Sequence, residues 1–482
     1  MTASRFGDMD PESFRHEAHR LADWIADYLA SSSRYPVLAN VSPGQVRAQL
    51  PAEAPAAGET FDAVFADFER IILPGITHWN HPGFFAYFAI TGSGPGILGE
   101  FLSAALNQQA MLWRTSPAAT ELEAVTLRWL QRLIRLPDEF EGVIYDTASI
   151  STLHALAAAR ERAVPQVRER GMAGRSELGM FRVYCSDQTH SSIDKSVILL
   201  GLGQSSLRKI PSDDQFRMRT DALRAAIEED RRSGITPLAV VATIGSTSTT
   251  SIDPVDEIAT LCAQQRVWLH VDAAYAGVAA MTTEYQHLLT AAATADSLVV
   301  NPHKWLFTPF DCSVLYCRHM DVLRSAFSLI PAYLQTNDPS VVKNLMDTGI
   351  QLGRRFRALK LWMVMRHFGA SGLRERLSEH MRLARLFASW VDESREFERL
   401  APVPFSVVCF RANAAGCDEG DAINERVVEL VNRSGEVFIS HTRLNGRFAI
   451  RLAIGNLHTT EEHVRRAWTL LNGAVIEASR LH

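Results

Sequence analysis

Asn301-Pro302-His303-Lys304-Trp305 is the stretch of this chain that says most about its fold. It follows the strand-like run 297–300, so its lysine lies just beyond a predicted strand. A second apolar run ends at Asp272, in Val267-Trp268-Leu269-His270-Val271-Asp272-Ala273-Ala274-Tyr275. Ligands of open α/β sheets bind at the carboxyl ends of the strands. We therefore expect Lys304 and Asp272 to lie at one site.

A lysine and a carboxylate at such an edge are the two groups that pyridoxal phosphate requires. The amine holds the cofactor's aldehyde as a Schiff base, and the anion keeps the ring nitrogen protonated, so that the ring withdraws electrons. For an arbitrary lysine, a solvated surface position would be the better interpretation. Lys304 instead follows an apolar run and lies between His303 and Trp305. The sequence therefore predicts a pyridoxal-phosphate site.

The region from about residue 80 to 375 alternates short apolar strands with helical stretches. Strands rich in Val, Ile and Leu predict a mostly parallel sheet that helices cover on both faces. One helix is expected to open at Ser116-Pro117 and to run through residue 133. The expected strands are 143–145, 181–185, 238–243, 268–271, 297–300 and 313–316.

The N-terminal region reads as two helices joined by a Pro- and Ala-rich connection over 36–58. Asp10-Pro11-Glu12 is typical of a helix start, and a second amphipathic helix is expected over about 60–73. The apolar stripe of the first helix has little of its own domain to pack against. We therefore expect this region to pack on another subunit of a homodimer.

The last hundred residues predict a small α+β domain. Strands are expected over 406–410, 437–440 and 447–454, and a helix over 421–432. Asn445-Gly446 is a strong tight-turn signal between the last two strands. Thr459 and Glu462 are expected to form a capping box for the final helix. The chain thus divides into a helical dimerisation segment (1–80), a large domain (81–375) and a small C-terminal domain (376–482).

Composition excludes several classes of protein. The chain has 482 residues, of which 47% are hydrophobic and 21% charged, as in ordinary globular proteins. A net charge of −5 offers no basic face for nucleic acid. The six cysteines form no Cys-x-x-Cys pair or zinc-type spacing, so we expect free thiols in a reducing compartment and no metal. With no apolar run near the ~18 residues of a membrane span, and no signal-peptide core at the start, we expect a soluble cytoplasmic protein.

Several long motifs in order resemble the group II pyridoxal-phosphate decarboxylases, and most closely the aromatic-L-amino-acid decarboxylase branch. The motifs are Asn301–Trp305, 270–277, His78-Trp79 with 81–88, 116–123, 186–192 and 352–357. The resemblance implies an α/β fold of pyridoxal-phosphate fold type I, which is aspartate-aminotransferase-like, and an interlocked homodimer. It implies decarboxylation of an aromatic L-amino acid to its amine and carbon dioxide.

The cofactor's phosphate is expected where a strand gives way to a helix. Thr147-Ala148-Ser149 lies between the strand 143–145 and a helical stretch, where helix-end amides hold anions. The resemblance implies phosphate contacts from Ala148, Ser149, Asn301 and His303. The family's usual glycine-serine entry is Asp146-Thr147 here, which leaves an acid beside the phosphate to be explained.

The resemblance implies further roles around the ring. His190 would lie over the cofactor ring, where an imidazole can stack, orient the carboxylate and move protons. Thr247 matches a family residue near the cofactor, although a polar loop residue is the plainer interpretation. Tyr333, in a Pro-containing loop, would deliver the proton to the alpha carbon after carbon dioxide leaves.

The substrate side is expected to be aromatic. Trp79, Tyr87 and Phe88 align with residues of the aromatic pocket, although clustered aromatics are usually core. Ile90 stands where the animal enzymes carry threonine, and the segment 345–349 departs from the family's more aromatic and basic one. These departures leave the preferred amino acid open.

Three other functions compete with decarboxylation. The same scaffold supports oxidative aromatic acetaldehyde synthases, which make an aldehyde in place of the amine. Gly94-Pro95-Gly96-Ile97-Leu98-Gly99 fits a dinucleotide fingerprint and suggests a nicotinamide oxidoreductase, but the acids that follow lie in a predicted helix. A pyridoxal-phosphate binding protein without turnover is the third alternative.

Overall fold

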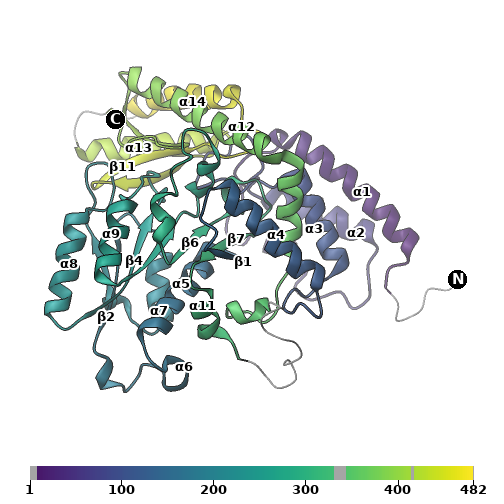
Figure 1. Cartoon of the computed structure of the whole chain (residues 1–482). Coiled ribbons are helices and arrows are strands. Elements are labelled where there is room, and N and C mark those ends of the chain that lie inside the picture. Colours follow the sequence, from purple (N-terminus) through teal and green to yellow (C-terminus); the bar gives the residue numbers. More distant parts are fainter. Residues whose placement is uncertain (1–7, 330–343, 414–416, 481–482) are drawn as a thin grey trace.

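The computed structural model describes residues 8–329, 344–413 and 417–480, with the backbone alone for 417–419. A large sheet lies between helices, and a smaller sheet with two helices lies against one end of it (Figure 1). Helices α1 (Pro11–Ala30) and α2 (Phe61–Asp67) lie at the periphery.

The large sheet has seven strands in the order β1-β7-β6-β5-β4-β2-β3. Strand β7 is antiparallel to both neighbours, whereas β6, β5, β4, β2 and β3 form parallel pairs. The predicted, mostly parallel sheet is confirmed. The strands are β1 (Glu141–Tyr145), β2 (Phe181–Ser186), β3 (Leu207–Ile210), β4 (Thr236–Thr243), β5 (Trp268–Asp272), β6 (Ser297–Val300) and β7 (Ser313–Cys317).

The prediction missed two strands, β8 (Phe397–Arg399) of the C-terminal sheet and β3 of the large sheet. The reason is clearest for β3. This strand reads Leu207-Arg208-Lys209-Ile210 and lies at the edge of the sheet. Two consecutive long cations mask the apolar signal that the buried central strands carry, because an edge strand is only partly covered. The central strands β5, β6 and β7 are buried along their whole length.

Helices cover both faces of the sheet, which explains why its strands carry almost no alternating polar residues. Helix α4 starts after Ser116 and ends at Leu133, as predicted. The helices of this region are α3 (Gly94–Leu106), α4 (Pro117–Leu133), α5 (Ala148–Ala163), α6 (Val167–Arg170), α7 (Ser192–Leu199), α8 (Thr220–Arg232), α9 (Val255–Gln265), α10 (Pro302–Trp305) and α11 (Met320–Phe327).

The cluster at residues 354–357 forms ion pairs with other parts of the large domain. Arg354 is buried, donates to Glu123 at 2.8 Å and also donates to the backbone oxygen of Ile144. Arg357 donates to Asp311 at 2.7 Å. These pairs attach the start of α12 (Arg357–Glu393) to the sheet and to α4.

The glycines of the 94–99 motif permit close packing. Residues 8–93 contain no strand, since Phe84 forms only an isolated bridge, so the dinucleotide fingerprint lacks its structural context. A Cβ at Gly96 would lie 2.3 Å from Cδ of Pro309, and one at Gly99 would lie 2.7 Å from Cα of Lys360. Both neighbouring atoms are rigidly held, one in a proline ring and the other in the backbone, so neither can move aside for a methyl group.

The C-terminal unit is an antiparallel sheet in the order β10-β11-β9-β8 with helices α13 and α14. Asn445 and Gly446, both with positive φ, form the predicted tight turn between β10 and β11. The elements are β8 (Phe397–Arg399), β9 (Val407–Ala412), α13 (Cys417–Arg433), β10 (Ser440–Leu444), β11 (Arg447–Ala453) and α14 (Glu461–Arg480).

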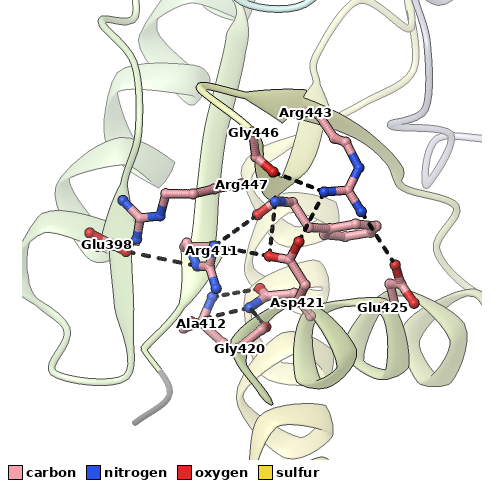
Figure 2. A network of polar contacts seen from close by, with 11 residues as sticks. Glu398, Arg411, Ala412, Gly420, Asp421, Glu425, Arg443, Gly446 and Arg447 are labelled. Carbon is pink, nitrogen blue, oxygen red and sulfur yellow. Dashed lines mark hydrogen bonds and ion pairs between the residues drawn. The ribbon is translucent and has the colours of Figure 1, made fainter. Parts of the chain in front are cut away.

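A charged network joins α13 to this sheet (Figure 2). Asp421 on α13 accepts hydrogen bonds from Arg411 at 3.2 Å, from Arg443 at 3.0 Å and from the Phe448 backbone at 3.0 Å. Arg411 is only 5% exposed, so its charge needs these partners.

Two local predictions in this unit are wrong. Residues 437–439 are not part of β10: Phe438 instead exchanges backbone hydrogen bonds with Gly83 and Phe85 of the large domain. Thr459 does not cap α14, because its hydroxyl donates to the Pro82 oxygen. The cap is Thr460, whose backbone N–H donates to Nδ1 of His463 at 3.1 Å.

Helix α12 connects the two hydrophobic cores. It breaks at Gly369, where φ is 61°, a value that glycine adopts without strain. Leu377 lies in the core of the large sheet, whereas Leu383 and Phe387 lie in the C-terminal core. The domain boundary at residue 375 therefore falls inside this helix, and the three-part division stays a proposal.

Membrane spans, metal sites and cysteine pairing can be assessed for the residues described above. None of the helices in the described ranges is long and apolar enough to cross a membrane. Within the same ranges no group of three His, Cys, Asp or Glu could hold a metal ion. The described cysteines are free and buried: Cys185, Cys262, Cys312, Cys317 and Cys409.

Candidate active site

Lys304 and Asp272 lie at the carboxyl ends of neighbouring strands, as predicted. Asp272 is the last residue of β5 and is 7% exposed, while Lys304 lies on the short helix α10 directly after β6. Desolvation lowers the pKa of the Lys304 amine. The Asp272 carboxylate raises this pKa, and the positive charge of Arg451 lowers it further. A lowered amine pKa raises the fraction of neutral, nucleophilic lysine.

His190 has a defined tautomer at the end of the β2–α7 connection. Its Nδ1 accepts the Ser192 backbone N–H at 3.1 Å and lies 3.0 Å from the Ser192 hydroxyl. The neutral ring therefore carries its proton on Nε2. Desolvation lowers the pKa of His190, with Asp272 as the largest opposing influence. The residue is thus a neutral imidazole with an Nε2–H donor near the Asp272 carboxylate.

The predicted phosphate end combines helix amides with a buried amide side chain. Ala148 and Ser149 are the first residues of α5, where backbone N–H groups have no acceptor within the helix. Asn301, 1% exposed, has an Oδ1 atom without a hydrogen-bond partner among the described residues. Its Nδ2 lies 3.3 Å from Nε2 of His303.

The tautomer of His303 decides how the Asn301 amide is oriented. Nδ1 of His303 accepts the Cys312 backbone N–H at 2.8 Å, and desolvation lowers the pKa of this histidine to about 3, so the neutral ring carries its proton on Nε2. That proton needs an acceptor, which the Asn301 oxygen supplies once the amide is turned by 180°. The amide N–H groups then occupy the unpartnered position, as an anion requires.

Asp146 lies directly beside these amides. Its Oδ1 accepts the Thr147 backbone N–H at 2.6 Å, and its Oδ2 accepts Nε2–H of Gln351 at 3.1 Å. The acid therefore ties the start of α5 to the segment after residue 344. Thr147 makes no side-chain cap.

Arg451 is a central residue that the sequence analysis missed. It is 4% exposed, its guanidinium carbon lies 4.6 Å from the Phe88 ring centroid, and Nη2 has no partner among the described residues. It donates to the backbone oxygens of Tyr87 and, at 3.0 Å, of Ser248. A lone arginine within the apolar run Phe448-Ala449-Ile450-Arg451-Leu452-Ala453-Ile454 was the signal that could have found it.

Phe88 is the aromatic residue that contacts the lysine. The Lys304 amine lies 5.4 Å from its ring centroid, on a ring that also stacks on Tyr275 at 3.9 Å. Trp79 and Tyr87 stack on each other at 6.1 Å, and Tyr87 is 56% exposed and has a φ of 51°. Positive φ in a bulky residue is strained and is often found at binding sites.

The remaining predicted residues are less closely connected. Thr247 is exposed and lies on a turn. Hydrogen bonds of the Ser246 hydroxyl with the hydroxyls of Thr249 and Ser251 close this turn. Ile90 is partly buried, two residues beyond Phe88. Tyr333 lies outside the described residues.

The assembled residues fit pyridoxal phosphate. A desolvated lysine and a buried carboxylate suit the aldehyde and the ring nitrogen. The α5 amides and the unpartnered Asn301 amide suit the phosphate.

Comparison with known proteins supports this assignment. The model of the pyridoxal-dependent decarboxylase conserved domain matches residues 43–413. The chain is 40% identical to tryptophan decarboxylase 2 of Oryza sativa subsp. japonica over 96% of its length and 94% of that protein. It is 40% identical to phenylacetaldehyde synthase of Arabidopsis thaliana, over 96% of each chain.

A solved structure extends the similarity to the whole fold. The crystal structure of Oryza sativa TDC with PLP and tryptamine superposes with a TM-score of 0.94 at 36% identity, covering 98% of this chain and 99% of that chain. This confirms the expected fold type I. On its sequence, its fold and its lysine–carboxylate site, the chain belongs to the family of pyridoxal-dependent decarboxylases and uses pyridoxal phosphate as its cofactor.

Proposed function

We propose that this protein is a carboxy-lyase that converts an aromatic L-amino acid into its amine and carbon dioxide. The observation that carries the proposal is the arrangement around Phe88. Its ring lies 5.4 Å from the Lys304 amine and 4.6 Å from the guanidinium carbon of Arg451, whose Nη2 has no partner in the described part of the chain. The amine that would hold the cofactor and the guanidinium that would bind the substrate carboxylate thus both lie against one aromatic ring.

Each residue has a physical role in this proposal. Bound pyridoxal phosphate supplies an electron sink for the carbon–carbon bond that breaks. Asp272 would keep the ring nitrogen protonated, and Lys304 would hold the cofactor through its aldehyde. Nε2–H of His190 orients the substrate, and Arg451 binds its carboxylate through the free Nη2. Phe88 excludes water from the amine, and Trp79 and Tyr87 stay predicted contacts of the aromatic substrate.

An aromatic acetaldehyde synthase is the second candidate, because the Arabidopsis relative at 40% identity carries that name. The two functions differ in products. We expect the purified protein to form equal amounts of amine and carbon dioxide from tryptophan, tyrosine, dihydroxyphenylalanine or phenylalanine, without hydrogen peroxide. Amine and peroxide are measured in parallel under air. Peroxide as the main product would replace the proposed function by the second one.

Tyr333 offers a variant for the same assay, on the strength of the resemblance alone. Replacing the phenol by Phe removes a proton donor and keeps the ring. Tyr333→Phe should lower amine output and raise peroxide. A variant that makes amine at the normal rate would remove Tyr333 from the role of proton donor.

We also propose that the protein works as a homodimer in the cytoplasm. Helix α1 has no buried residue, and α3 exposes Leu98, Phe101, Leu102 and Leu106 along one face. An apolar stripe of this kind is characteristic of a subunit interface.

The five described cysteines are unpaired, which agrees with a reducing compartment. The proposed partners are the amino-acid substrate and a second copy of the chain, with no nucleic acid or membrane.

A further inference from the structure

Asp146 places a negative charge at the helix end that is proposed to hold the cofactor's phosphate. It is the residue between β1 and the cap of α5, directly before Thr147. Its carboxylate already occupies one donor of this turn, the Thr147 backbone N–H at 2.6 Å. The amides of Ala148 and Ser149 follow at once in the chain.

Hydrogen bonds on both oxygens hold the carboxylate in this position. Oδ1 accepts from the Thr147 N–H and lies 3.3 Å from its hydroxyl, while Oδ2 accepts from Gln351 at 3.1 Å. The segment that carries Gln351 is itself fixed, because the Ile350 N–H donates to Nε2 of buried His154 at 3.2 Å. No arginine or lysine among the described residues forms an ion pair with Asp146, so its carboxylate contacts only neutral amide and hydroxyl groups and keeps its negative charge.

A phosphate dianion at the α5 amides therefore meets an uncompensated acid. The second, independent sign of an anion site is the Asn301 amide, which is 1% exposed and has one polar atom without a partner among the residues that the structure describes. Helix-end dipoles and amides attract the dianion, whereas a like charge within a few residues opposes it.

We propose that Asp146 weakens the binding of pyridoxal phosphate through charge repulsion and so keeps the cofactor exchangeable. The proposal rests on the phosphate site assigned under the proposed function. Asp146 is a determinant of cofactor affinity and takes no part in the reaction.

The test separates charge from shape. Full-length holoenzyme is dialysed to equilibrium against graded pyridoxal phosphate, and bound cofactor is measured by its absorbance. Asp146→Asn keeps the size and can still accept the Thr147 N–H, and we expect its Kd to be at least tenfold lower than that of the wild type. Asp146→Glu keeps the charge and should bind like the wild type. Asp138→Asn, which removes an exposed acid from the loop before β1, is the matched control and should change nothing.

A second ligand locates the effect at the phosphate. Pyridoxal, which has the aldehyde and ring without the phosphate, should bind Asp146→Asn and wild type equally well. Asp146→Gly removes the charge and the hydrogen bonds together, and it too should bind pyridoxal phosphate more tightly. Unchanged or weaker binding of pyridoxal phosphate in both variants overturns the proposal, as does an equal gain for pyridoxal. Failure of the wild type to bind pyridoxal phosphate at all would instead overturn the site assignment itself.

Discussion

At the scale of single residues, the Lys304 amine is held between opposing influences. Burial and Arg451 lower its pKa, and Asp272 raises it. Because its pKa is lowered, a larger fraction of this amine is neutral and nucleophilic than of an ordinary lysine. The three residues come from β5, β11 and α10, so elements from both units must be in place before the amine has its final reactivity.

We expect borohydride to fix the cofactor covalently to Lys304 and to no other lysine. Reduction of the imine followed by peptide mass analysis locates the label. Lys304→Ala should carry no label and should lose nearly all turnover. Lys195→Ala, an exposed lysine on α7, is the control and should be labelled normally. Labelled cofactor in the Lys304→Ala protein would contradict the assignment.

Arg451→Met should reduce kcat/KM for the amino acid by about 30-fold or more, because removing one partner of a desolvated charge pair costs about 2–5 kcal/mol. Inhibition by the corresponding amine should change much less, since the amine has no carboxylate. Steady-state kinetics and amine competition measure both quantities. Arg447→Met, on the exposed end of the same strand, is the control. An equal loss of amine and amino-acid binding would assign Arg451 a purely structural role.

At the scale of elements, α3 and α12 pack so closely that a methyl group has no room. Gly99→Ala would place Cβ 2.7 Å from the Lys360 Cα, and overpacking of this kind costs about 1–3 kcal/mol. The thermal unfolding midpoint should fall. Gly94→Ala is the matched control, since no atom lies within 4 Å of its Cβ position on the same helix. Equal midpoints for the two variants would disprove the close contact.

Helix α1 packs mainly through a few aromatic contacts. Trp24 lies edge-on to Phe65 and Phe68, and the Tyr28 hydroxyl lies 2.9 Å from Nδ1 of His78. Phe14 stays 53% exposed. Deleting residues 1–58 should therefore give aggregates or inactive monomers in light scattering, whereas deleting residues 1–7 should not. A fully active monomer from the longer deletion would contradict the proposed interface.

At the scale of the whole molecule, buried histidines make stability depend on pH. Desolvation lowers the pKa of His81, His154, His270 and His380 to about 4 and that of His303 to about 3, from an ordinary 6.5. The unfolded chain then binds more protons below pH 6.5, so stability is lost as the pH falls towards 4. Buried Asp253, with a pKa raised to about 6, acts in the opposite direction.

Unfolding at pH 5.5 should take up about four protons. The denaturant midpoint of the holoenzyme, measured at saturating cofactor, should fall steeply between pH 7 and 5. His380→Gln should lower the proton uptake by about one. A midpoint that does not change over this range would show that these histidines are accessible to protons in the folded state.

The sequence predicted those parts of the fold whose determinants are local. Apolar strands, Asp10 as a helix cap and the Asn445-Gly446 turn depend on neighbouring residues and are confirmed. Thr459 and Phe438 could not be predicted, because their hydrogen-bond partners Pro82 and Phe85 lie more than 350 residues away in the chain. Arg451 was missed for the same reason: its partners Tyr87 and Ser248 come from two distant segments.

These distant pairings also govern how the chain matures during synthesis. In the described sheet β1 has one neighbour, β7, and the segment at Gly83 and Phe85 pairs with Phe438 and Ala453. A ribosome that adds ~5–20 residues per second needs roughly 10–30 s to supply β7 after β1, and longer to supply the C-terminal unit. Throughout that time an apolar strand and an aromatic segment leave the exit tunnel without partners. Slower translation lengthens this exposure, so the yield of native enzyme depends on chaperone capacity as well as on the stability of the finished fold.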